Sequence, residues 1–133
     1  MHAKPMLQFT GLIIVAVAIS IVARPAIGMT LGEKLFRSNC IGCHSINCNR
    51  TGPKLKNILG RKAGSLADFS HYSEPLKNSG IVWSEAKLDE FLTAPSKLVP
   101  GTAMSIVSIK DAKERREIIS FVKKQDTSVD LCF

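Results

Sequence analysis

The sequence predicts a small all-α domain, and three observations support that fold class. A chain of 133 residues has room for one domain but not for two well-filled hydrophobic cores. Apolar residues recur at helical spacing in several segments, whereas no segment shows a convincing strand alternation. Hydrophobic residues make up 45% of the chain, which argues against a disordered basic tail despite a formal charge of +7. The length also excludes multi-domain enzymes, nucleotide-binding folds and long repeat arrays.

The first element is an uncharged stretch at residues 5–23, which contains the apolar run 12–19. Lys4 precedes it, Arg24 follows it, and the small residues Ala26 and Gly28, in a small-x-small pattern, complete the layout of a secretory signal peptide. The same stretch is long enough to cross a bilayer as an uncleaved anchor, and a buried core helix is the third interpretation. We expect residues 1–28 to be a signal peptide or a retained membrane anchor. Cleavage after Gly28 leaves 105 residues with a formal charge of +5.

Two further segments are expected to be helical. Residues 30–39 can form a helix with Leu35 and Phe36 on one face. Ser84 is a suitable N-cap for a second helix, in which apolar residues repeat at helical spacing until Pro95 ends the pattern. The repeating residues are Leu88, Phe91 and Leu92.

The last helix is expected after Asp111, which forms with Glu114 an acidic variant of the capping box. Its apolar stripe ends at two lysines that suit the negative end of the helix dipole. Phe121 in this stripe is expected to contact Phe36 of the first helix of the domain. The stripe consists of Ile118, Ile119, Phe121 and Val122, followed by Lys123 and Lys124.

The cysteines carry the clearest chemical signal in the sequence. Cys40, Cys43 and His44 form the C-x-x-C-H pattern that attaches a c-type haem. Two thiols separated by two residues can each form a thioether to a vinyl group of the porphyrin, and the adjoining histidine then offers an imidazole nitrogen to the iron. Covalent attachment keeps a haem bound even when the surrounding fold is small.

Other uses of these residues compete with the haem site. A zinc site could use Cys40, Cys43, His44 and Cys48, although structural zinc sites usually separate their ligand pairs by a longer loop. A redox dithiol would need a strand before Cys40, and the sequence shows no such pattern. A disulfide scaffold made from all four cysteines would require a very small Cys40–Cys43 ring.

A haem that carries electrons without binding substrate needs a sixth ligand, and a methionine sulfur is one option. After the N-terminal segment the methionines are Met29 and Met104. Met104 follows a Pro-Gly loop signal at Pro100. On position alone, a methionine in a small domain is more often core filling than a ligand.

From Gly32 to Lys124 the sequence resembles the class I cytochromes c of the mitochondrial and photosynthetic-bacterial type. The resemblance implies one covalent haem c, attached through Cys40 and Cys43 and ligated by His44 and Met104. It further implies cofactor contacts at Pro53, Arg61, Tyr72 and Trp83, with no catalytic residue. The expected organisation is therefore a haem domain at 29–126 and a C-terminal tail at 127–133. The motifs that carry the resemblance, in order, are Gly32–Phe36, Cys40–His44, Thr51–Pro53 with Gly60–Gly64, Tyr72–Ser73 with Trp83, and Pro100–Met104.

The resemblance implies a one-electron carrier rather than an enzyme. Iron held by both a histidine and a methionine has no open position for a substrate, and thioether ligation raises its potential. The expected donor is a quinol-oxidising cytochrome bc complex, and the expected acceptor is a terminal oxidase or a photosynthetic reaction centre. A dedicated acceptor for a periplasmic dehydrogenase is an alternative, and a haem that loses Met104 and acts as a peroxidase or gas sensor is another.

The positive charge predicts redox protein partners with acidic docking surfaces, because opposite fields accelerate encounter. Nucleic acid is not expected as a partner, since no interleaved aromatic and basic stretch is present. We expect a monomer in the periplasm, in contact with a membrane only if the N-terminal segment is retained. Candidate docking residues, which can equally be ordinary solvated lysines, are Lys54, Lys56, Lys62 and Lys97.

Several residues depart from the family pattern. Asn39, Ser96 and Ala103 stand where many relatives carry lysine, which is expected to weaken docking onto an acidic partner or to shift it to another patch. Phe91 replaces a tyrosine that can bond the ligand sulfur, and this loss should alter the potential. His71 resembles a one-residue insertion and is expected to be a surface histidine rather than an alternative ligand.

Cys48 and Cys132 lie outside the recognisable pattern. In an oxidising compartment we favour a disulfide between them, which would tie the tail to the loop after the haem motif and requires their Cα atoms to lie within about 7 Å. Free or intermolecular thiols remain the alternatives.

Overall fold

The structure is a computed structural model, which describes residues 28–105, 107–124 and 132. Within those residues it is all-α, as predicted, with five helices and a single isolated bridge between Lys62 and Val82 in place of any strand. The helices are α1 (Leu31–Asn39), α2 (Glu74–Lys77), α3 (Glu85–Thr93), α4 (Pro95–Leu98) and α5 (Ala112–Lys124). The signal or anchor predicted for residues 1–28 lies outside the described residues except at Gly28, as does most of the predicted tail. No helix in the described part of the chain has the length and apolar character needed to cross a membrane.

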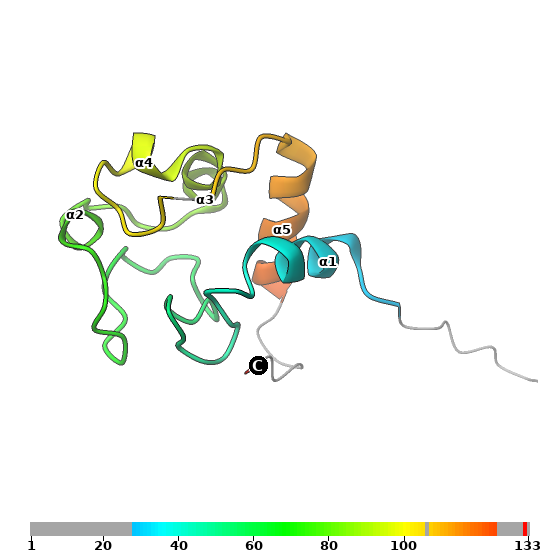
Figure 1. The fold of residues 1–133 in the computed structure, drawn as a ribbon, viewed down its shortest axis with the longest axis horizontal. Helices are drawn as coiled ribbons and strands as arrows, with labels where there is room; N and C mark the ends of the chain where they lie inside the picture. Colours follow the sequence, from blue (N-terminus) through cyan, green and yellow to red (C-terminus); the bar gives the residue numbers. More distant parts are fainter. Residues whose placement is uncertain (1–27, 106, 125–131, 133) are drawn as a thin grey trace, which may run out of the picture.

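Helices α1 and α5 cross each other and form one side of the domain (Figure 1). The predicted contact between Phe36 and Phe121 is confirmed, with ring centroids 5.2 Å apart. Gly32 allows the close approach, because a Cβ at this position would overlap the carbonyl oxygen of Glu117 and lie 2.9 Å from the Cβ of Phe121. The predicted apolar stripe of α5 is buried along its whole length.

The helix starts are set by side-chain caps. Thr30 accepts a hydrogen bond from the Glu33 N–H at the start of α1, and Ser84 accepts one from the Lys87 N–H at the start of α3, both at 3.1 Å. Before α5, Oδ1 of Asp111 accepts from the N–H groups of residues 113 and 114 at 2.6 and 3.1 Å. The predicted N-caps Ser84 and Asp111 are therefore confirmed.

The predicted end of the second helix at Pro95 is only partly correct. Helix α3 ends at Thr93, and Pro95 then begins the short helix α4. Proline suits the first turn of a helix, where its missing N–H would have no intrahelical partner. Neither α2 nor α4 was expected from the sequence.

A disulfide joins Cys48 to Cys132, with the Cα atoms 5.3 Å apart. This confirms the pairing favoured from the sequence over free or intermolecular thiols. It also excludes a zinc site that uses Cys48. The described residues contain no cluster of three or more His, Cys, Asp or Glu residues arranged to hold a metal ion.

Candidate functional site

One wall of a central cavity is built by the chain that leaves α1. Cys40 caps α1 through its N–H, which donates to the Phe36 carbonyl at 2.8 Å. The N–H groups of Cys43 and His44 then both donate to the Cys40 carbonyl, at 3.1 and 2.8 Å. This tight turn keeps Cys40, Cys43 and His44 together in the cavity lining. Both thiols are free, Cys40 buried and Cys43 exposed, which rules out a disulfide scaffold made from all four cysteines. Burial, with a smaller contribution from Cys43, raises the pKa of Cys40 to about 12.

The imidazole of His44 is oriented by the loop that follows it. Nδ1 lies 2.8 Å from the carbonyl oxygen of Pro53, which can only accept, so Nδ1 carries the proton and donates. Nε2 is therefore left with its lone pair. Burial lowers the pKa of His44 and the hydrogen bond to Pro53 opposes that shift, so the neutral ring is favoured. Gly52 packs flat against the ring, where a Cβ would overlap the imidazole.

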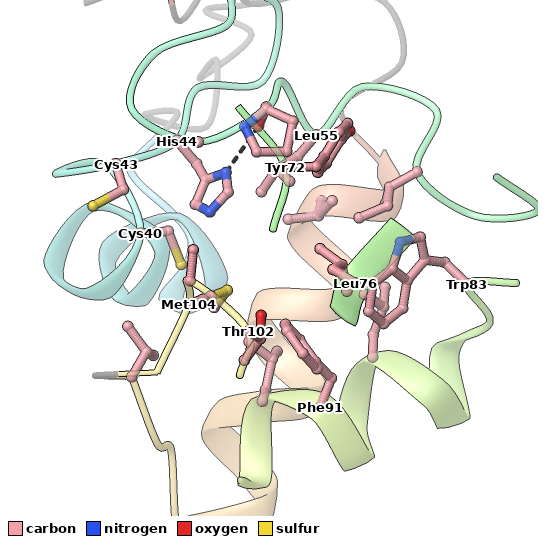
Figure 2. Close-up of a pocket in the computed structure, with 18 of the residues that line it drawn as sticks. Cys40, Cys43, His44, Leu55, Tyr72, Leu76, Trp83, Phe91, Thr102 and Met104 are labelled. Atoms are coloured by element: carbon pink, nitrogen blue, oxygen red, sulfur yellow. Dashed lines mark hydrogen bonds between the residues drawn. The ribbon is translucent and has the colours of Figure 1, made fainter. Parts of the chain in front are cut away.

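The opposite wall is formed by the loop after α4, which carries Met104 into the cavity (Figure 2). The Thr102 N–H donates to the Val99 carbonyl at 3.0 Å, and the Ala103 N–H donates to the hydroxyl of Ser73 at 3.3 Å. Ser73 precedes α2, so this loop is tied to a segment 30 residues earlier in the chain. Met104 is half-buried and packs against the hydrophobic core.

The cavity between the two walls has a volume of about 240 Å³, and its lining is mainly apolar. Figure 2 shows Trp83, Leu76 and Phe91 around the part of the cavity away from the two thiols. The Trp83 and Phe91 rings meet edge to face at 5.1 Å. All eight residues expected to contact the cofactor line this one cavity: Cys40, Cys43, His44, Pro53, Arg61, Tyr72, Trp83 and Met104.

Polar groups gather at one part of the lining. Arg61 donates to the carbonyls of Lys54 at 2.9 Å and Lys56 at 3.3 Å, which fixes its guanidinium beside the cavity. Burial lowers the pKa of Arg61, and burial raises the pKa of Tyr72. His71 also lines the cavity but is exposed, as expected for a surface histidine. The candidate docking residues differ: Lys62 and Lys97 are exposed, Lys56 is half-buried, and Lys54 pairs with Asp68 at 2.6 Å.

Two contributors to the site were not identified from the sequence: Leu76 supplies an apolar wall, and Thr102 brings a hydroxyl into the cavity lining. Phe91, which the resemblance placed beside the ligand sulfur, also lines the cavity. Among the described residues, the Thr102 hydroxyl is buried and has no hydrogen-bond partner. No sequence signal distinguishes Thr102, because its burial arises only when the cavity forms.

These residues fit a covalently attached haem. Two free thiols, an imidazole with an available Nε2 and a thioether line the same cavity. The cavity is apolar, as a porphyrin requires, and the unpartnered Thr102 hydroxyl leaves one donor for a polar group of the occupant.

Comparison with known proteins also indicates a haem protein. The family model for cytochrome c matches residues 29–126. Cytochrome c type-1 of Ascaris suum is 38% identical over 96 residues, covering 71% of this chain and 85% of that protein. Cytochrome c2 of Rhodomicrobium vannielii is 40% identical over 97 residues, covering 71% of this chain and 76% of that protein. The solved structure of cytochrome cH from Methylobacterium extorquens is 42% identical with a TM-score of 0.67, covering 71% of this chain and 96% of that one.

Proposed function

Because the chain belongs to the cytochrome c family, whose members are haem-based electron carriers rather than enzymes, we propose that His44 and Met104 are the axial ligands of one haem c. The observation that supports this most directly is their shared cavity, with the imidazole and the thioether on opposite walls beside two free thiols. Cys40 and Cys43 are the proposed attachment points. The bound haem supplies a one-electron change of its iron.

The protein residues hold that chemistry in place. The Pro53 carbonyl fixes the tautomer of His44, so that Nε2 faces the cavity and the imidazole is a stronger donor. Met104 would hold the haem iron from the side of the cavity that faces His44, and would thereby keep substrates from the iron. Trp83, Leu76 and Phe91 keep water away from the cavity, so a change in charge occurs in surroundings that need little reorganisation. Arg61 and Tyr72 are the proposed polar contacts to the haem propionates.

The proposed partners are redox proteins with acidic docking surfaces. The proposed route runs from a quinol-oxidising cytochrome bc complex to a terminal oxidase or a photosynthetic reaction centre. Support comes from the formal charge of +5 on residues 29–133, which accelerates encounter with an acidic surface, and from the exposed lysines at positions 62 and 97. We further propose a monomer that is exported by residues 1–28, either cleaved or retained as a membrane anchor, with a haem domain at 29–126 and a tail at 127–133.

The ligands are tested by spectroscopy of the purified full chain. Met104→Ala should abolish the near-infrared sulfur-to-iron band of the oxidised protein and lower the midpoint potential. Met29→Ala is a matched control, because Met29 is 52% exposed and does not line the cavity. A colourless protein, or an unchanged spectrum in Met104→Ala, would show that the proposed site is wrong. Cell fractionation with N-terminal sequencing tests export and cleavage.

A further inference from the structure

The loop that orients His44 has little regular structure of its own. Residues 45–53, which we call the proximal loop, contain no helix or strand. Its backbone is held by the Gly52 N–H, which donates to the Cys43 carbonyl at 2.8 Å, and by the Arg50 N–H, which donates to the Gly52 carbonyl at 2.9 Å. Ser45 and Ile46 at the start of the loop are fully buried, and their carbonyls accept from the Leu55 and Lys56 N–H groups at 3.0 and 2.9 Å. The remainder, residues 47–53, is half-buried or exposed. Segments of this second kind open locally at low free energy, well below that of global unfolding.

The proximal loop nevertheless carries both groups that position the imidazole. The Pro53 carbonyl accepts from Nδ1, and Gly52 packs against the ring face. An opening of this loop therefore removes the hydrogen bond and the packing contact together. Something must hold the loop closed if His44 is to keep a constant orientation.

Cys48 lies in the middle of the proximal loop, and its bond to Cys132 is the covalent tie between this loop and the C-terminal region. The tie reaches across a sequence separation of 84 residues. Ile46 packs in the hydrophobic core at the start of the loop. Beyond Cys48 the tie is assisted by two side-chain hydrogen bonds: Asn49 Nδ2 donates to the Asp68 carbonyl at 2.7 Å, and Arg50 Nη1 donates to the Ile41 carbonyl at 2.6 Å. Both involve exposed groups, where water competes for the same donors.

We propose that the Cys48–Cys132 disulfide is a clasp that holds the proximal loop against His44, so that these two cysteines are positioning residues for the axial imidazole. The proposal rests on the proposed ligation by His44. Cleavage by a dithiol reductant transfers two electrons and two protons to the bond: Cys48 and Cys132 become thiols, and the reductant becomes a disulfide. The loop then opens more often, and the imidazole loses the carbonyl that strengthens it as a donor.

A clasp and a simple cross-link predict different patterns of hydrogen exchange. A cross-link that only restricts the unfolded chain protects the amides that exchange by global unfolding, and leaves local opening of the proximal loop unchanged. A clasp protects the loop amides themselves. The informative amides are that of Gly52 in the loop, bonded to the Cys43 carbonyl, and that of Lys54 directly after it, bonded to Oδ1 of Asn49 in the loop at 2.9 Å. The Ile109 amide, bonded to the Leu92 carbonyl at 2.9 Å, serves as the reference.

The experiment uses the full-length protein with its haem, before and after treatment with dithiothreitol, beside the Cys48→Ser/Cys132→Ser variant. We expect exchange at Gly52 and Lys54 to accelerate at least tenfold in both the treated protein and the variant. The midpoint potential should shift to a more positive value, because a weaker imidazole donor stabilises oxidised iron less. Treating the variant with dithiothreitol should change nothing further, which shows that the reagent acts through this bond.

Two results would overturn the clasp. In the first, exchange accelerates at Ile109 while exchange at Gly52 and Lys54 and the midpoint potential stay unchanged, which is the pattern of a simple cross-link. The other is the finding of free thiols at Cys48 and Cys132 in the untreated protein. Both are distinguishable from failure of the proposed function, which would appear as a protein without haem or without a ligated methionine.

Discussion

Replacing Arg115 should loosen the segment that connects the Met104 loop to α5. This side chain is 8% exposed and lies between three elements of the fold. Nε forms an ion pair with Oδ1 of Asp89 in α3 at 2.7 Å. Nη1 donates to the carbonyls of Ile109 and Lys110, both at 2.9 Å. The Arg115→Met variant keeps most of the apolar volume of the side chain and removes all of these bonds.

The magnitudes decide which of these interactions dominates. The Asp89 side chain is 40% exposed, so solvent screens the ion pair and its loss should cost about 1 kcal/mol or less. A hydrogen bond from a charged donor contributes about 1.5–3 kcal/mol, and the Ile109 carbonyl would be left buried without a partner. We expect Arg115→Met to lower the free energy of unfolding by about 3–5 kcal/mol. Asp89→Asn should lower it by about 1 kcal/mol.

Guanidinium chloride unfolding followed by far-ultraviolet circular dichroism measures both values. Arg116→Met is the matched control, because the neighbouring arginine is exposed and the change should have little effect. Arg115→Met should also raise the affinity of added imidazole for the haem, since the Met104 loop is less firmly held. Equal losses in Asp89→Asn and Arg115→Met would refute the reasoning, because the ion pair and not the carbonyl bonds would then dominate.

Three further changes test other parts of the structure. Phe36→Ala removes a fully buried ring from the crossing of α1 and α5, so unfolding experiments should show a loss of about 3–5 kcal/mol, whereas exposed Leu31→Ala should cost little. Gly52→Ala places a Cβ against the proximal imidazole and should destabilise the haem protein by about 1–3 kcal/mol, while Gly42→Ala, with open space around its Cβ, should be neutral in the same assay. The N–H groups of residues 114 and 113 hold the pKa of Asp111 below its usual 3.8, so the stability it contributes is complete above that pH and is lost as the pH falls further. Stability measured against pH should therefore fall less steeply below pH 4 in Asp111→Asn, and an unchanged acid limb would count against this account.

The features that were predicted correctly from the sequence are those that depend mainly on residues close together in the chain. A cap such as Ser84 acts on an amide three positions later, and the spacing of Leu88, Phe91 and Leu92 defines one face of a single helix. The pairing of Phe36 with Phe121 could be inferred because each is the large residue of an apolar stripe at one end of the domain. Each of these needs only local geometry, or one obvious long-range partner.

The unpredicted features depend on contacts that no local pattern encodes. Helices α2 and α4 are single turns, too short for a periodic signal, and Pro95 can either end a helix or begin one. Arg115 was not singled out in the sequence, yet it is buried by partners up to 26 residues away. The unpartnered hydroxyl of Thr102 is likewise visible only once the cavity has formed around it.

The two walls of the haem cavity also differ in how far apart in the sequence their stabilising contacts lie. This difference predicts the order in which the walls unfold. The His44 wall is built mainly by contacts within the segment from Cys40 to Pro53, and two covalent restraints keep it together: the proposed attachment of the haem at two cysteines and the Cys48–Cys132 disulfide. The Met104 wall depends on distant partners, such as the Ser73 hydroxyl 30 residues away. Long-range contacts are lost when helices separate even slightly, whereas the turn beside His44 can persist. Increasing denaturant should therefore abolish the sulfur-to-iron band before the helical circular dichroism is lost, and coincident transitions would show that the two walls unfold as one unit.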